Sequence, residues 1–287
     1  MQMGLIGTGL MGGPLGDRLL QAGHSLTVYN RTREKTTALV QNGAVSAQTP
    51  GEVITQSEII VLMLADAVAI EGCLFSETLD WAGKTVIQMG TIAPQESTAI
   101  ATRVTTLGGR YLEAPVLGSI PEARSGSLII MVGADPEDFD RVLPILKLFG
   151  PDPKWIGPVG SGAVVKLALN QLIGSLTAGF SLSLGLVQQS GTPIEGFMEI
   201  LRQSALYAPT FDKKLQRMLD RNYENPNFPT QHLLKDMRLF NTAALPKGLN
   251  IEVSEAIASV LTQALAQNLA ALDYSAIYDA IVPGQDT

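Results

Sequence analysis

The 287-residue sequence predicts an α/β domain built on a parallel sheet, followed by an all-helical domain. Two observations carry this prediction. Strand-like and helix-like segments alternate through the first half, which is typical of a parallel sheet with right-handed crossovers. After residues 157–160 the strand-like pattern ends and long helical segments follow. We therefore expect one domain at residues 1–160 and a second at residues 161–287.

The first strand and helix enclose a glycine-rich turn. An apolar run at residues 3–6 leads directly into Gly-x-Gly-x-x-Gly, and a helical segment follows. Gly7 permits the tight turn, Gly9 lets the backbone approach a pyrophosphate, and Gly12 lets helix and strand pack closely. We interpret this segment as the dinucleotide-binding turn of a Rossmann-type domain, the alternative being a glycine-rich turn in an ordinary strand–helix unit. It comprises Gly7, Thr8, Gly9, Leu10, Met11 and Gly12.

The next strand indicates which dinucleotide binds. Residues 25–29 predict a strand about 20 residues after the glycines, where the ribose-binding acid of an NAD site stands. Asn30 in that place removes the repulsion of a 2′-phosphate, and Arg31 supplies a planar cation suited to phosphate oxygens. Thr32 can accept from a helix N-terminal N–H and donate to phosphate. We therefore expect NADP(H), unless Arg31 is simply solvated beside a helix cap.

The remaining elements of the first half follow the same alternation. Apolar runs predict buried strands, and Pro94 at a helix start fits its fixed φ. Leu64, where the third strand ends, is assigned to the cofactor site as well. The expected strands are 59–64, 85–89, 110–113, 127–132 and 154–156, and the main helices between them are 94–107 and 136–149.

The second half begins with a strongly apolar segment, residues 167–187, about as long as a membrane span. It contains Asn170 and Gln171 and many small residues, which favours burial in a core or an oligomer interface over membrane insertion. We expect a homodimer or homotetramer built through this domain. The further helices are expected at 193–204, 210–220, 230–245, 251–271 and 274–281.

Composition excludes several classes of function. A net charge of −7 argues against nonspecific binding to nucleic acid or anionic membranes. The single cysteine, Cys73, cannot form an internal disulfide, and its apolar surroundings predict a small buried residue. The chain has only two histidines, His24 and His232, and the sequence therefore predicts no His/Cys metal site. No targeting segment precedes the first strand, so we expect a soluble cytoplasmic protein.

Lys166 is the first candidate for chemistry. It lies at the start of the apolar helix, near the domain junction, and shares a helix face with Asn170 four residues later. Desolvation lowers the pKa of a lysine toward neutrality, which general acid–base catalysis needs. Asn170 could orient the amine or bind a substrate oxygen. A lysine whose amine reaches solvent from an apolar helix is the alternative.

Two further segments are weaker candidates. Lys235 and Asp236 stand at the start of a helix and could equally be a solvated pair. Residues 113–119 run from a strand end into a loop, and ligands bind at such ends in open α/β sheets. Gly118 and Ser119 could present an N–H and a hydroxyl to a carboxylate, or form a simple turn.

Taken together, these segments resemble the β-hydroxyacid dehydrogenase family along nearly the whole chain and in family order. The opening glycine turn matches the cofactor signature, 113–126 the substrate segment, 160–170 the catalytic helix and Lys235-Asp236 the late cofactor-side motif. Within the family the chain looks most like NADPH-dependent glyoxylate/succinic semialdehyde reductases. The resemblance implies that Lys166 is catalytic, that Lys235 lies at the cofactor, and that Thr91, Phe228 and Asp236 lie at the active site.

One residue departs from the family pattern. The family has a serine after the Pro-Val of the substrate segment, and that serine contacts the substrate carboxylate, whereas Leu117 stands here. A leucine cannot donate a hydrogen bond. Either Ser119 and the Gly118 amide hold the carboxylate, or the substrate is not the usual small carboxylate.

The resemblance implies reversible hydride transfer in a site between the domains, with Lys166 exchanging the proton and Thr91 and Asn170 positioning the reactants. The expected substrate is a small carboxylate-bearing aldehyde. Three alternatives remain: an NAD-dependent 3-hydroxyisobutyrate-type dehydrogenase, an imine reductase, which the presence of Lys166 disfavours, and a non-catalytic cofactor-binding module.

Overall fold

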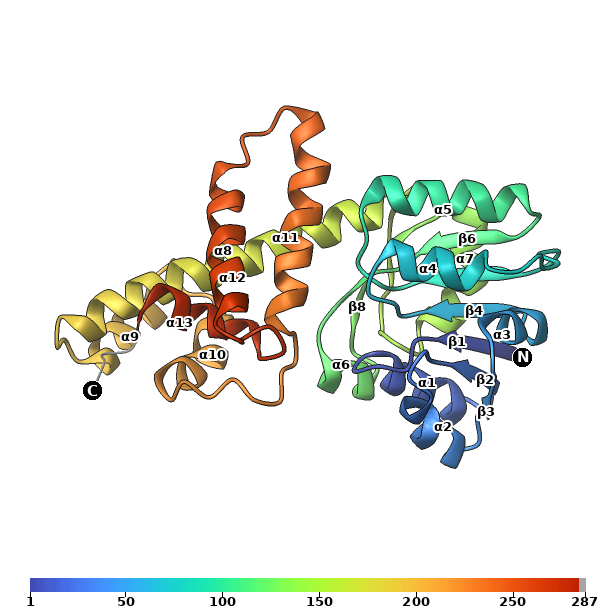
Figure 1. Ribbon diagram of the computed structural model, residues 1–287, viewed down its shortest axis with the longest axis horizontal. Helices are drawn as coiled ribbons and strands as arrows, with labels where there is room; N and C mark the ends of the chain where they lie inside the picture. Colours follow the sequence, from blue (N-terminus) through green and yellow to red (C-terminus); the bar gives the residue numbers. More distant parts are fainter. Residues whose placement is uncertain (284–287) are drawn as a thin grey trace. The chain divides into compact units, whose positions relative to one another are not determined.

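The computed structural model describes residues 1–283 and divides into two compact units (Figure 1). The first is Met1–Lys166, and the second begins at Leu167. The division falls inside helix α8 (Ser161–Gln189), later than the boundary expected at residue 160. The start of α8 belongs to the first unit because it packs on its sheet: a Cβ added at Gly162 would lie 2.6 Å from the Met131 carbonyl oxygen.

The first unit is organised around one twisted sheet with β1 near its centre. The hydrogen-bonded order is β3-β2-β1-β4-β5-β6-β8-β7, with β9 paired to β8. The chain moves outward from β1 to β2 and β3 and then crosses to β4 on the other side of β1. The strands are β1 (Gln2–Ile6), β2 (Ser25–Tyr29), β3 (Val45–Ser46), β4 (Ile59–Leu62), β5 (Thr85–Gln88), β6 (Arg110–Glu113), β7 (Val116–Leu117), β8 (Ile129–Gly133) and β9 (Lys154–Gly157).

Helices cover both faces of this sheet (Figure 1). The apolar strand residues alternate between two separate hydrophobic cores, one beneath each layer of helices. One layer contains α1 (Gly12–Gln21), α2 (Thr37–Gln41), α6 (Ile120–Ser125) and α7 (Pro136–Leu146); the other contains α3 (Pro50–Gln56), α4 (Ala67–Leu74) and α5 (Pro94–Thr106). The Rossmann-type α/β fold predicted for the first domain is confirmed.

The sheet is parallel from β3 to β6, as predicted, but it has antiparallel pairings at one side that the sequence did not predict. Strand β8 runs antiparallel to both β6 and β7, and only β9 beside it is parallel again. The connection into β8 contains only the six-residue helix α6, which is too short to carry the chain back along the full sheet for a parallel crossover. The two-residue strands β3 and β7 were not predicted, since so short a run carries no periodicity.

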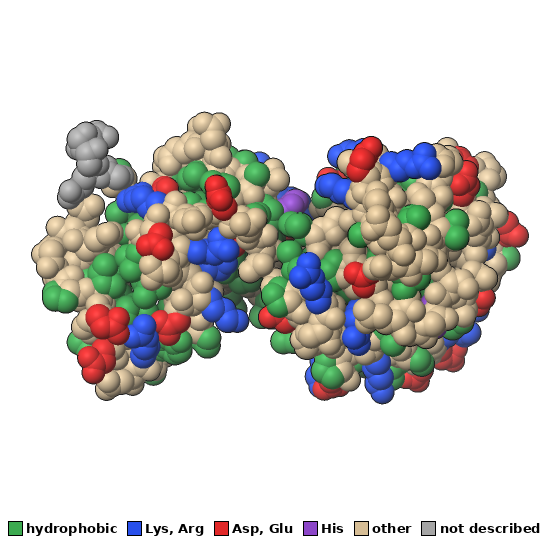
Figure 2. Space-filling view, turned by 90° about the horizontal axis from the view of Figure 1, so that it is seen from below, with side chains coloured by type: hydrophobic (Ala, Val, Ile, Leu, Met, Phe, Trp, Pro, Cys, Tyr) green, Lys and Arg blue, Asp and Glu red, His purple; other side chains and the backbone are tan. Residues whose placement is uncertain are grey.

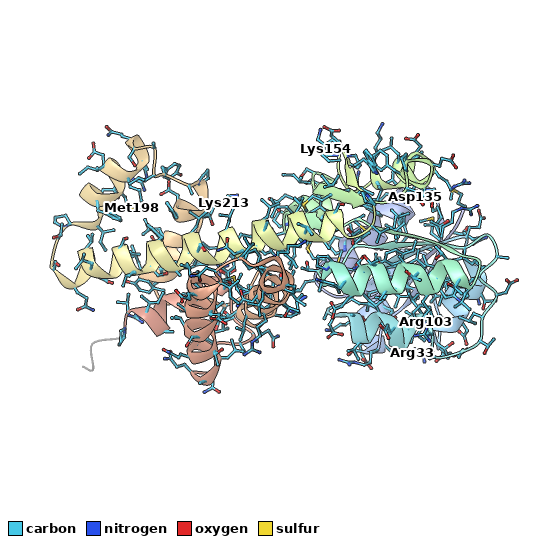
Figure 3. The ribbon with its side chains drawn as sticks, turned by 90° about the horizontal axis from the view of Figure 1, so that it is seen from above. Arg33, Arg103, Asp135, Lys154, Met198 and Lys213 are labelled. Carbon is cyan, nitrogen blue, oxygen red and sulfur yellow. The ribbon has the colours of Figure 1, made fainter. Side chains whose placement is uncertain are left out.

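The second unit is helical throughout its described residues, apart from an isolated bridge between Pro229 and Asp273. Two hydrophobic clusters hold it together, and α8 contributes side chains to each. Met198, labelled in Figure 3, is fully buried against α8 in one of them. The helices after α8 are α9 (Ile194–Gln203), α10 (Pro209–Leu219), α11 (Thr230–Ala244), α12 (Glu252–Ala266) and α13 (Ile277–Ile281), with short 3-10 turns at Leu245–Lys247 and Tyr274–Ala276.

Helix α8 is buried only in part. By length and composition it could cross a membrane, and 39% of its most apolar 18-residue window is buried within the chain. Leucines along it remain exposed, Leu182 at 65% and Leu186 at 71%. Hydrophobic side chains also stand among charged ones on the face in Figure 2. One side of this helix is therefore buried in the hydrophobic clusters, and another side is exposed.

Candidate functional site

The glycine turn has the geometry of a nucleotide-binding loop. Gly7 has φ +95°, and a Cβ there would lie 2.3 Å from the Met63 carbonyl oxygen. A Cβ at Gly12 would lie 1.8 Å from the Gly7 carbonyl oxygen, so the first turn of α1 packs on β1 with no space for a side chain. A Cβ at Gly9 would meet nothing within 4 Å. Packing within the chain thus explains Gly7 and Gly12, while the space at Gly9 is open to a ligand.

Asn30, just after β2, is hydrogen-bonded to this turn. The Thr8 amide donates to Asn30 Oδ1 at 3.1 Å, and Asn30 Nδ2 donates to the Thr32 carbonyl oxygen at 2.8 Å. The Thr8 hydroxyl is buried and has no hydrogen-bond partner in the described chain. A buried hydroxyl without a partner, beside an open glycine, fits a bound phosphate group, which would accept from this hydroxyl and from N–H groups at the start of α1.

The residues predicted to meet the 2′-phosphate follow β2. Arg31 and Thr32 are exposed, and Thr32 begins the 3-10 helix Arg33–Thr36. The Thr32 side chain makes no capping hydrogen bond there, contrary to our expectation, because a 3-10 turn rather than an α-helix begins at this point. Arg33 differs from Arg31 in donating to Gln48 Oε1 at 3.3 Å.

The loops that follow β4 and β5 meet each other. A Cβ added at Gly90 would lie 2.3 Å from the Leu64 carbonyl oxygen, so the two backbones touch. Thr91 follows Gly90 and is half-buried. Leu64 and Thr91 therefore lie together at the carboxyl edge of the sheet, close to where the chain crosses from one side of β1 to the other, the position at which open α/β sheets bind ligands.

Lys166 lies on the first part of α8 and is 9% exposed. The start of that helix is held by Glu113 at the end of β6: Glu113 Oε1 accepts from the Gly160 amide at 2.8 Å and the Ala163 amide at 3.0 Å. Burial raises the pKa of Glu113, while these amides and the Ser97 hydroxyl act to lower it. Sequence reasoning did not find this contact, although a lone acid ending a buried strand was a signal for it.

The predicted carboxylate-binding segment is already hydrogen-bonded within itself. Leu117 ends β7, and Gly118 has φ +125°. The Ser119 amide and hydroxyl both donate to Glu122 Oε2, at 2.8 and 2.9 Å. The two Ser119 donors that we assigned to a substrate carboxylate are therefore occupied by a carboxylate of the chain.

In the second unit, three predicted residues come together on α8 and α11. Asn170 Nδ2 donates to Asp236 Oδ2 at 2.5 Å, and Lys235 Nζ lies 3.0 Å from Asp236 Oδ1. Asn170 and Asp236 are both buried. Phe228 precedes this helix, and its ring lies 5.8 Å from that of Tyr274. Asn170 shares a face of α8 with Lys166, as the spacing of four residues predicts.

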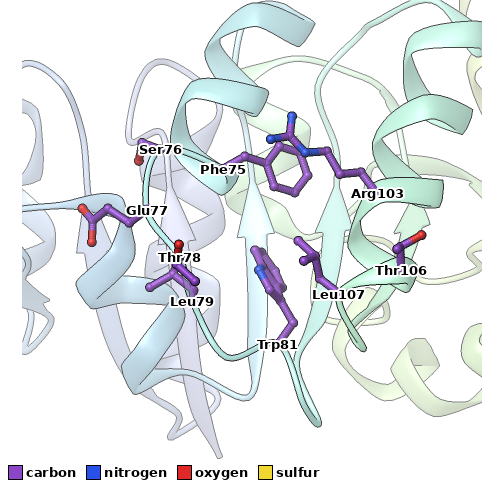
Figure 4. Close-up of a pocket in the computed structure, with 9 residues that line it drawn as sticks. All are labelled: Phe75, Ser76, Glu77, Thr78, Leu79, Trp81, Arg103, Thr106 and Leu107. Atoms are coloured by element: carbon purple, nitrogen blue, oxygen red, sulfur yellow. The ribbon is translucent and has the colours of Figure 1, made fainter.

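A separate cavity lies at the opposite edge of the sheet (Figure 4). It has a volume of about 420 Å³, and Phe75, Trp81 and Leu107 line it. The Arg103 guanidinium lies 3.8 Å from the centre of the Phe75 ring. Trp81 and Leu107 come just before β5 and β6, whereas the glycine turn and Thr91 follow strands, so this cavity is distinct from the nucleotide loop.

Comparison with known proteins agrees with this arrangement. Residues 2–157 match the family profile for the NAD binding domain of 6-phosphogluconate dehydrogenase, and residues 160–281 match that for the NAD-binding region of NADP-dependent 3-hydroxyisobutyrate dehydrogenase. Glyoxylate/succinic semialdehyde reductase 1 of Arabidopsis thaliana is 34% identical over 285 residues, 98% of each chain. 2-Hydroxy-3-oxopropionate reductase of Escherichia coli K12 is 33% identical over 286 residues, covering 98% of this chain and 97% of that one.

Among solved structures, 3-hydroxyisobutyrate dehydrogenase of Mycobacterium tuberculosis with L-serine aligns with a TM-score of 0.87 at 18% identity, covering 97% of this chain and 98% of that one. This likeness concerns the fold alone. The two profile matches and the full-length relatives carry the assignment. The chain belongs to the 3-hydroxyisobutyrate dehydrogenase-like family of β-hydroxyacid dehydrogenases, oxidoreductases with NAD(P)-binding domains that act on CH–OH groups.

Proposed function

We propose that this protein reduces small carboxylate-bearing aldehydes, such as succinic semialdehyde and glyoxylate, to hydroxy acids with NADPH. The observation that carries the proposal is Lys166, a buried amine on a helix whose first turn is fixed by Glu113. The reductase from Arabidopsis, similar over the full length, supports the substrate class.

NADPH is proposed because of the residues after β2. No carboxylate stands where an NAD site places one; the neutral Asn30 donates to the Thr32 carbonyl oxygen and accepts from the Thr8 amide. Arg31 is exposed beside it and can pair with a 2′-phosphate. Gly9 and the Thr8 hydroxyl would hold the pyrophosphate, and when bound the reduced nicotinamide supplies the hydride.

The chain's own residues transfer the proton and orient the substrate. The protonated Lys166 amine donates a proton to the carbonyl oxygen as negative charge develops on it, and in the oxidative direction the neutral amine removes the hydroxyl proton. Thr91 and Asn170 orient the substrate. Ser119 and the Gly118 amide hold the substrate carboxylate, which requires it to share or replace the Glu122 contact at Ser119.

A panel of carbonyl substrates with NADPH, followed by loss of absorbance, tests this proposal. Succinic semialdehyde and glyoxylate should be turned over, and Lys166→Ala should lower kcat by about 10²–10⁴-fold, since general acid catalysis contributes that much. NADPH affinity of the variant should be unchanged. Near-normal turnover by Lys166→Ala refutes its assigned role, and tight NADPH binding without turnover on the whole panel favours a non-catalytic module.

A second candidate is oxidation of hydroxy acids with NAD, as in 3-hydroxyisobutyrate-type dehydrogenases. The match of residues 160–281 to the profile for NADP-dependent 3-hydroxyisobutyrate dehydrogenase favours the hydroxy acid of this candidate, but it does not favour NAD over NADP. Rates with NADPH and NADH, measured in both directions, separate the two candidates. Faster oxidation of 3-hydroxyisobutyrate with NAD than reduction of either aldehyde with NADPH would select the second.

We further propose that the protein is a homodimer or homotetramer joined through its helical unit. Exposed leucines on α8 and further exposed apolar residues of the helical unit, Ile200 at 73% and Leu206 at 78%, support this. Light scattering at micromolar concentration tests it, and a monomer there contradicts it.

A further inference from the structure

Glu113 is a buried carboxylate with no part in the proposed proton transfer. It ends β6 and is 1% exposed. Its Oε1 accepts from the Gly160 and Ala163 amides at 2.8 and 3.0 Å. The first amides of a helix have no partner within the helix, so this one oxygen satisfies donors at the start of α8 and places negative charge at its positive end.

The surrounding backbone is shaped to this oxygen. A Cβ added at Gly133 on β8 would lie 2.4 Å from Glu113 Oε1, and one added at Gly162 on α8 would lie 3.2 Å from it. Any larger residue at Gly133 displaces the carboxyl. Strand β8 and helix α8 therefore approach each other around Glu113. This close approach depends on the absence of side chains at Gly133 and Gly162.

A polar cluster extends from Glu113 to other strands. The Ser97 and Tyr111 hydroxyls lie 2.9 Å apart in the interior. Gln88 on β5 is the backbone partner of Glu113 in the pairing of β5 with β6. The cluster thus joins β5, which leads to Thr91, with β6, which leads to the 114–119 segment, and with α8.

We propose that Glu113 is a positioning residue that fixes the Lys166 turn of α8 relative to the strand ends carrying the substrate. Lys166 lies three residues after Ala163, whose amide Glu113 holds. Misplacing a reacting group by 1 Å can cost about 10²-fold in rate. The inference rests on the proposed role of Lys166, and it assigns to Glu113 an effect on turnover beyond its effect on stability.

Four variants separate the two effects. Glu113→Gln retains an oxygen that can accept from both amides, whereas Glu113→Ala removes it. Gly133→Ala keeps the carboxyl but forces it to shift, because the added Cβ would lie 2.4 Å from Oε1. Glu52→Ala is the matched control, because Glu52 Oε2 accepts from the Gln48 amide at 2.8 Å and holds the start of α3, far from Lys166 in sequence.

The readouts are kcat per mole of bound NADPH and hydrogen–deuterium exchange of residues 160–168. Because only folded protein binds NADPH, dividing the rate by the amount of bound NADPH corrects for any unfolded enzyme in a variant. Glu113→Ala and Gly133→Ala should lower this kcat by about 10²-fold with little change in KM and speed exchange at the start of α8. Glu113→Gln should stay within about threefold of the wild type, as should Glu52→Ala.

Normal kcat per bound NADPH in Glu113→Ala, or in Gly133→Ala if the former does not fold, overturns the proposal. Equal losses in Glu113→Gln and Glu113→Ala also overturn it, because an acceptor oxygen is what the geometry requires. If the wild type reduces no carbonyl compound, the proposed function fails. Unchanged exchange at residues 160–168 in Glu113→Ala then separately overturns the contact on which positioning depends.

Discussion

The Asn170 side chain donates from Nδ2 to Asp236 Oδ2 at 2.5 Å, which fixes the direction of its amide. Lys235 pairs with the other carboxylate oxygen at 3.0 Å. The Asn170 Oδ1 atom is buried and accepts no hydrogen bond from the described chain. In the proposed reaction, this oxygen would accept from a substrate hydroxyl or an ammonium group, and Asp236 would act by holding the amide in this orientation.

Removing Asp236 should cost both stability and activity. Asp236→Ala leaves the buried Asn170 donor unsatisfied, which costs about 1–3 kcal/mol in the free energy of unfolding. Because the amide is then free to rotate, kcat/KM should fall by about tenfold, equivalent to 1.4 kcal/mol. Urea unfolding and steady-state kinetics measure the two effects. Glu255→Ala, an exposed acid in the first turn of α12, is the control, and equal stability of the two variants would contradict the prediction.

Gly9 and Gly12 should respond differently to alanine. Gly9→Ala introduces a Cβ with no protein atom within 4 Å, so thermal unfolding without cofactor should be nearly unchanged. The same methyl occupies the space a pyrophosphate needs, and NADPH affinity should fall at least about tenfold. Gly12→Ala places a Cβ 1.8 Å from the Gly7 carbonyl oxygen and should lower the melting temperature clearly. Unchanged NADPH affinity in a folded Gly9→Ala protein would exclude this loop as the pyrophosphate site.

Arg31 should set the preference for NADPH over NADH. Hydrogen bonds to charged groups contribute about 1.5–3 kcal/mol, so Arg31→Ala should lower the ratio of kcat/KM for the two cofactors by about 10–150-fold. Arg33→Ala is the control, since Arg33 is also exposed but donates to Gln48. Its ratio should stay within about threefold of the wild type. A larger change for Arg33 than for Arg31 would transfer the role to Arg33.

The sequence predicted the elements whose pattern is local. The glycine turn, the apolar strands and the long helix α8 each carry their own signal, and their bounds lie close to those in the structure. The antiparallel β8 was missed because its direction depends on how short α6 is, a property of the path between strands rather than of β8 itself.

Contacts between distant residues were not readable from the sequence. Glu113 meets amides 47 and 50 residues away, and Asn170 meets Asp236 66 residues away. Motif spacing named Asn170 and Asp236 separately but gave no sign that they pair. The Ser119–Glu122 contact was readable, since a serine followed three residues later by a glutamate is a capping-box pattern, and it changes what Ser119 has free for a substrate.

Stability should depend on pH through Glu113. Burial raises its pKa above the ordinary 4.5, so between 4.5 and the folded-state pKa the folded protein binds more protons than the unfolded chain. The stabilisation from this group is therefore complete below pH 4.5 and is lost as the pH rises through the folded-state pKa. Glu113→Gln cannot ionise and lacks this loss. The difference in unfolding free energy, variant minus wild type, should increase between pH 4 and pH 7 in urea titrations. A difference that decreases over this range would mean that the Gly160 and Ala163 amides outweigh burial and hold the pKa of Glu113 below 4.5.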